Sequence, residues 1–68
     1  MIIYKDDIAK RLYYSKEIPL NSIGVFQSHV GEWLFWYTSD YTYNTGFAYS
    51  QPEAIKIAKE NFKPLNNS

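Results

Sequence analysis

The segment Trp33–Thr38 constrains the fold most, because its first five residues are all apolar or aromatic. Successive side chains of a strand point to opposite faces of the sheet. Trp33, Phe35 and Tyr37 would lie on one face, and Leu34 and Trp36 on the other. An antiparallel strand with one solvated face alternates apolar and polar residues instead. Both faces therefore need cover, from residues 1–20, from a second copy of the chain or from a partner protein.

The size of the chain leaves room for one small core. At 68 residues it is near the smallest size at which a single hydrophobic core suffices. Aromatic residues make up 19% of the sequence, and each buried ring removes a large area from water. We expect one domain over residues 1–63 and a frayed tail over 64–68. The absence of Cys excludes disulfides and thiolate metal sites.

Three segments carry the residues that favour strands, namely Ser22–His29, Trp33–Thr38 and Thr45–Tyr49. Gly31-Glu32 fits a two-residue hairpin loop between the first two segments, because that type of loop begins with glycine. This register pairs Val30 with Trp33, Ser28 with Phe35 and Phe26 with Tyr37. The opposite face would then hold Ile23, Val25, Gln27, His29, Leu34 and Trp36. The region Ser39–Asn44 is expected to turn the chain into the third strand.

A helix is predicted over about 51–63. Ser50 and Glu53 form a capping box, in which Ser50 accepts from the amide of residue 53 and Glu53 reaches back to the amide of Ser50. Pro52 suits the first turn. An apolar stripe follows at helical spacing, with Lys63-Pro64 ending the helix. The stripe consists of Ala54, Ile57, Ala58 and Phe62.

The first twenty residues allow two interpretations. Asp6 could cap a helix over about 6–16, which is the interpretation we favour. Alternatively, Met1–Tyr4 and Arg11–Tyr14 carry β-favouring residues and could form strands. The predicted fold class is thus α+β, a three-stranded antiparallel sheet packed on a C-terminal helix (β-β-β-α) with a short N-terminal helix.

The segment Thr45–Ala54 (TGFAYSQPEA) resembles the strand-to-helix junction of the plant AP2 domain and of integrase arm-binding domains. It is also similar to the junction in HicB-type antitoxins. The resemblance implies the β-β-β-α architecture. DNA binding is not carried over with it, because the strands here lack the Arg and Lys with which those DNA-binding families hold the duplex.

The charge distribution disfavours nucleic acid as a partner. Net charge is zero, and no Lys or Arg occurs from Glu17 to Ile55, where most of the aromatic residues lie. Single-strand binders combine stacking rings with a positive groove, and duplex readers need several cations on phosphate. The basic residues gather near the two ends of the chain. They are Lys5, Lys10, Arg11, Lys16, Lys56, Lys59 and Lys63.

Catalysis, metals and membranes are also disfavoured. His29 is the only histidine, and no carboxylate stands near it at a ligand-like spacing. No paired acids or glycine-rich phosphate loop are present, so we expect no enzyme activity, no cofactor and no metal. No apolar run is long enough to span a bilayer, and the first residues do not resemble a signal peptide. We therefore expect a cytoplasmic protein.

The leading hypothesis is a small non-catalytic module that binds another protein, or itself, through its aromatic sheet. Such a module would act as an adaptor or inhibitor, and the Ile-, Lys-, Asn- and Tyr-rich composition is typical of AT-rich bacterial or phage genomes. One alternative is a DNA-binding domain that uses the basic helix and N-terminal segment. A second is a structural subunit or homodimer. The predicted partner-binding residues are Trp33, Phe35, Trp36, Tyr37, Tyr41 and Tyr43.

Overall fold

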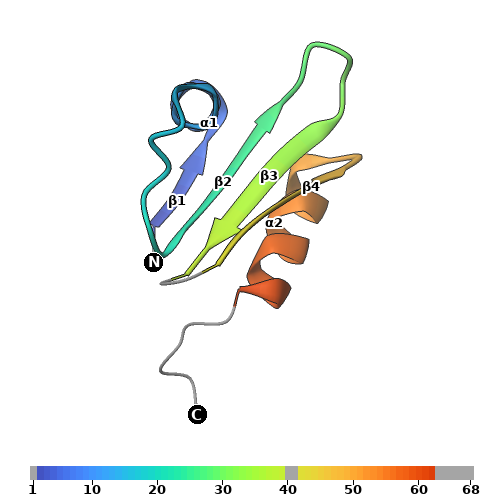
Figure 1. Cartoon of the computed structure of the whole chain (residues 1–68). Helices are drawn as coiled ribbons and strands as arrows, with labels where there is room; N and C mark the ends of the chain where they lie inside the picture. The colour runs from blue at the N-terminus through green and yellow to red at the C-terminus, as the bar shows by residue number, and fades with distance from the viewer. Residues whose placement is uncertain (1, 40–41, 63–68) are drawn as a thin grey trace.

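The chain folds into a four-stranded sheet with one helix on each face (Figure 1). The computed structural model describes residues 2–39 and 42–62. The predicted tail and Tyr41 lie outside these residues. In chain order the elements are β1 (Ile2–Lys5), α1 (Asp6–Ser15), β2 (Ser22–Gln27), β3 (Trp33–Thr38), β4 (Tyr43–Ala48) and α2 (Gln51–Asn61).

The α+β class is confirmed, and the three predicted antiparallel strands are present as β2, β3 and β4, but the sheet has a fourth strand, β1, that the prediction of a three-stranded sheet did not include. The strand order is β1-β2-β3-β4, with β1 parallel to β2 and the other neighbours antiparallel. The N-terminal segment holds both a strand and a helix, which the sequence offered as alternatives. Because α1 connects β1 to β2, the connection is a crossover, and a crossover allows the two strands to run parallel.

The junction between β1 and α1 also differs from the prediction. Asp6 does not cap the helix; the N-cap is Lys5, which makes no side-chain capping bond. Asp6 instead has φ +59°, in the left-handed region that Asp tolerates better than most residues. This conformation lets the chain pass from strand to helix without a loop.

The predicted register of the first hairpin is wrong by an odd number of residues. Gln27 pairs with Trp33, and Val25 with Phe35. The Ser28 amide donates to the Glu32 carbonyl (2.7 Å), which leaves a three-residue loop, 29–31. Gly31 ends that loop with φ +99°, as in hairpin loops whose last residue is left-handed. An odd shift exchanges faces, so Ile23, Val25 and Gln27 join Trp33, Phe35 and Tyr37.

The second hairpin is tighter than expected. β4 begins at Tyr43, which pairs with Thr38, so Tyr43 and Asn44 belong to the strand and not to a loop. The helix that follows β4 is confirmed, and it ends at Asn61. Ser50 accepts from the Glu53 amide (3.3 Å) as predicted, but the Glu53 carboxylate accepts from the amide of Tyr49, not from that of Ser50.

One core lies between the sheet and α2. Ile23, Val25 and Phe35 from the strands pack against Ala54 and Ala58 of the helix. Trp33 and Tyr37 are half-buried at the border of this cluster. The predicted apolar stripe of α2 thus faces the sheet.

A second core lies between the sheet and α1. Its centre is Trp36, which is 0% exposed, with Phe26 and Ala9 beside it. The ring of Tyr13 stacks on that of Trp36, with 6.4 Å between centroids. Gly24 stands directly opposite Trp36 on β2, where the absence of a side chain makes room for the indole.

A buried network of hydroxyl groups ties the connector after α1 to the sheet. The Trp36 Nε1–H donates to Ser22 Oγ (3.0 Å), and Ser22 Oγ donates to the Pro19 carbonyl (2.6 Å). The Thr38 hydroxyl donates to the same carbonyl (2.9 Å). These bonds satisfy the buried polar groups and fix the path of the chain on either side of Pro19.

Candidate functional site

Helix α1 covers only part of its sheet face. It packs on β1 and β2, and in the described part of the chain no helix reaches across to β4 on this side. Three β4 residues share the face of Trp36 and remain exposed, and we call them the open face: Tyr43, Thr45 and Phe47. Tyr43 is 55% exposed and Phe47 52%. Within the described residues, α1 thus covers Trp36 of β3, but this cover does not extend to the β4 edge.

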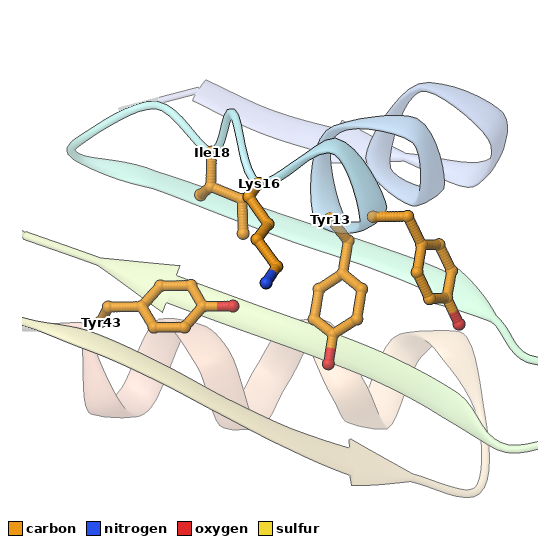
Figure 2. A pocket seen from close by; sticks show the side chains of 5 residues that line it. Tyr13, Lys16, Ile18 and Tyr43 are labelled. Carbon is orange, nitrogen blue, oxygen red and sulfur yellow. The ribbon is translucent and has the colours of Figure 1, made fainter.

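A pocket of about 490 Å³ lies between α1 and the open face. Figure 2 shows Tyr13 and Ile18 on one side of it and Tyr43 of β4 on the other, with the Lys16 amine between them. Tyr14 also lines the pocket. We call this the Lys16 pocket. Its size falls within the range of small-molecule and side-chain binding sites.

The end of α1 places Lys16 in the pocket. Lys16 is the C-cap residue and has φ +62°. Its amide and that of Glu17 both donate to the Leu12 carbonyl, which closes the last turn and reverses the chain. The connector then runs back over the sheet and is held at Pro19 by the hydroxyl network. Ile18 is therefore fixed on the same side as Tyr13.

The described lining of the pocket combines apolar walls with one charged residue, Lys16. None of the described residues that line it is acidic, and among residues 2–39 and 42–62 Lys16 has no ion-pair partner. Burial raises the pKa of the Tyr43 phenol, and the nearby Tyr13 raises it further. Tyr43 therefore stays protonated at neutral pH and can donate a hydrogen bond. Such a site suits an apolar group that carries a negative charge.

The structure divides the sequence-predicted binding residues into core and surface. Trp36 and Phe35 are buried on opposite faces of β3. Trp33 and Tyr37 are half-buried on the α2 side. Of the predicted binding residues that the structure describes, only Tyr43 lies in the pocket and on the open face.

Several residues of the site were missed from the sequence. The sequence alone places Tyr13 and Tyr14 in a segment with two interpretations, and Lys16 among the basic residues near the chain ends. It places Phe47 in a strand and gives it no binding role. Helical spacing could have indicated that Tyr13 and Lys16 line the same site. The two residues are three positions apart, and residues at this spacing lie on one side of a helix.

The basic residues do not form one surface. Those of the N-terminal segment belong to β1, α1 and its C-cap, while Lys56 and Lys59 belong to α2 on the other side of the sheet. A duplex held by one face would meet only part of this charge. Among residues 2–39 and 42–62, no group of three potential ligands could hold a metal ion. No helix in that part of the chain has the length and apolar character needed to cross a bilayer.

Comparison of the chain with protein-family models, with curated proteins and with solved structures finds no match.

Proposed function

We propose that the chain is a small non-catalytic protein-binding module, an adaptor or inhibitor, that holds its partner on the open face and in the Lys16 pocket. One observation carries the proposal: aromatic side chains stay exposed beside a pocket after both helices have packed. Tyr and Phe are common interface anchors, because they bury a large area with few rotatable bonds. The anchors proposed here are Tyr13, Tyr14, Tyr43 and Phe47, with Lys16 as the polar contact.

The pocket indicates what the partner presents. An apolar or aromatic side chain would pack between Tyr13, Ile18 and Tyr43. A carboxylate on or next to it would meet the Lys16 amine and accept from the Tyr43 hydroxyl. The proposed partner is therefore a protein segment in which an apolar residue adjoins Asp, Glu or a C-terminal carboxylate.

Site-specific cross-linking tests the proposal. A photoreactive phenylalanine analogue at Tyr14, which lines the pocket, should capture a partner protein in extracts of the source cells. The same analogue at Glu60, which is exposed on α2, serves as the control. Capture from Tyr14 should also be lost when Lys16 is changed to Glu. Equal capture from both positions, or capture that survives Lys16→Glu, would contradict the proposed site.

A pair of small probes tests the chemistry of the pocket. In an NMR titration we expect N-acetylphenylalanine to shift the signals of Tyr13, Lys16 and Tyr43. Its neutral amide should bind roughly tenfold more weakly, the equivalent of about 1.4 kcal/mol, near the lower end of the value of a hydrogen bond to a charged group.

Lys16→Met provides the matched control, because Met keeps an unbranched apolar side chain and removes the charge. The variant should bind the acid and the amide equally weakly. If the unaltered chain already fails to distinguish the acid from the amide, Lys16 does not recognise a carboxylate.

A further inference from the structure

Within residues 2–39 and 42–62, no strand pairs with the outer edge of β4, and the two hairpins determine which of its backbone groups point outward. Ser28 donates to Glu32, so this pair is hydrogen-bonded, and bonded pairs alternate along an antiparallel ladder. The residues of β3 whose backbone groups form hydrogen bonds with β2 are therefore Leu34, Trp36 and Thr38. The residues between them form backbone hydrogen bonds with β4. The Ser39 amide donates to the Thr42 carbonyl (3.0 Å). This bond independently gives the same alternation of bonded pairs between β3 and β4. The inward backbone groups of β4 belong to Asn44, Gly46 and Ala48.

The outward N–H and C=O groups of β4 consequently belong to the open-face residues Tyr43, Thr45 and Phe47. Edge strands are commonly protected from pairing by charges, by proline or by a bulge. β4 (YNTGFA) contains no charged residue and no proline, and it pairs with β3 without a break. By contrast, β1 at the other edge is shorter and ends in Lys5.

From this edge we infer that two copies of the chain pair through antiparallel β4 strands to form a dimer with one continuous sheet. The two-fold axis would pass between the two Thr45 residues. Thr45 then faces Thr45 of the second copy, and Tyr43 faces Phe47 of the second copy. In this register every outward N–H and C=O of the three residues meets a partner.

The side chains are the reason to assign the edge to a second copy and not to a foreign strand. The register places an aromatic pair on each side of a Thr–Thr pair, and both kinds of pair stabilise adjacent strands. No like charges face each other, because the strand carries none. Tyr43 lies two residues before Thr45 and Phe47 lies two residues after it. The two Tyr43–Phe47 pairs therefore form only when the β4 strands of two copies run antiparallel.

The rest of the fold leaves space for this contact. Both copies of α1 lie over β1 and β2, away from the junction. On the α2 side, Asn44 is exposed and Gly46 is only half-buried, so α2 leaves this edge accessible. The dimer would carry two Lys16 pockets on one side of an extended sheet. It does not depend on the foreign partner proposed above, because it forms through the outward backbone groups of β4.

Sedimentation equilibrium of the purified chain, without any partner, tests the dimer. We expect a species of twice the 8.0 kDa chain mass. Thr45→Pro removes an outward N–H at the axis, a position where an edge strand tolerates proline. Thr45→Lys would bring two positive charges together there. Both variants should be monomers over the same concentration range, whereas Val30→Lys, in the β2–β3 loop, should remain a dimer.

A cysteine variant tests the register. Because the chain has no Cys, Thr45→Cys gives a single thiol that would face its own copy at a Cα separation of about 5.5 Å, within reach of a disulfide. Mild oxidation should yield a covalent dimer for Thr45→Cys and none for Val30→Cys. A monomeric unaltered chain, or dimers that persist with both Thr45→Pro and Thr45→Lys, would overturn the inference. If the chain is a monomer but still binds N-acetylphenylalanine in the Lys16 pocket, the dimer is ruled out and the proposed function is not.

Discussion

Trp36→Ala is expected to lower the free energy of unfolding by about 3–5 kcal/mol, the usual cost of truncating a buried aromatic side chain. Trp36 is 0% exposed and is the largest fully buried side chain among the described residues. Its loss would also leave Ser22 Oγ without its donor and Tyr13 without the ring it stacks on. A domain of this length has a total stability of roughly 3–10 kcal/mol, so the change should remove about a third or more of that stability.

Urea denaturation followed by circular dichroism measures this effect. Tyr49→Ala is the matched control, because Tyr49 is also aromatic but is 80% exposed. Its free energy of unfolding should stay within about 0.5 kcal/mol of the unaltered chain. A folded Trp36→Ala protein with normal stability would show that Trp36 does not organise the α1 side of the sheet.

Gly24→Ala is expected to destabilise the fold through the same contact, by about 1–3 kcal/mol or more. A methyl group at Gly24 would stand 2.2 Å from the nearest atom of the Trp36 ring. The ring cannot move aside easily, because it is hydrogen-bonded to Ser22 and packed against Tyr13. The strands would have to separate or the indole would have to leave its position.

A double-mutant cycle distinguishes this clash from a general effect of alanine in β2. In a Trp36→Leu background the smaller side chain leaves room for the methyl group, so Gly24→Ala should cost much less than it does in the unaltered chain. Residues in direct contact show interaction energies of about 0.5–3 kcal/mol. Additive costs measured by urea denaturation would contradict the proposed close packing.

The sequence predicted the elements whose patterns are local. The bounds of β3 agree with the predicted segment, and α2 follows its cap and apolar stripe. In both cases a run of neighbouring residues carries the whole signal. The N-terminal helix was also expected, but β1 was only an alternative because four residues give too short a pattern.

The hairpin register and the binding site depended on longer-range geometry. Gly31-Glu32 fits a two-residue loop locally, yet the three-residue loop places Val25 beside Phe35 in the α2 core and Gly24 beside Trp36. Packing on both faces outweighs a turn preference, since burial of several large side chains is worth more than one loop conformation. The length of the loop between β2 and β3 in turn determines which face of the sheet each residue of β2 occupies.

By itself, the sequence of β3 determined that both sides of the sheet need cover, because alternate side chains of a strand point in opposite directions. Only the tertiary structure decided how that need is met. Helix α2 covers one face, and α1 covers the other as far as Trp36. A helix is about 10–12 Å across and neighbouring strands lie about 4.8 Å apart, so α1, which packs on β1 and β2, does not reach β4. Among the described residues, Tyr43 and Phe47 of β4 stay exposed on this face, and together with the Lys16 pocket they form the surface that we propose binds a partner.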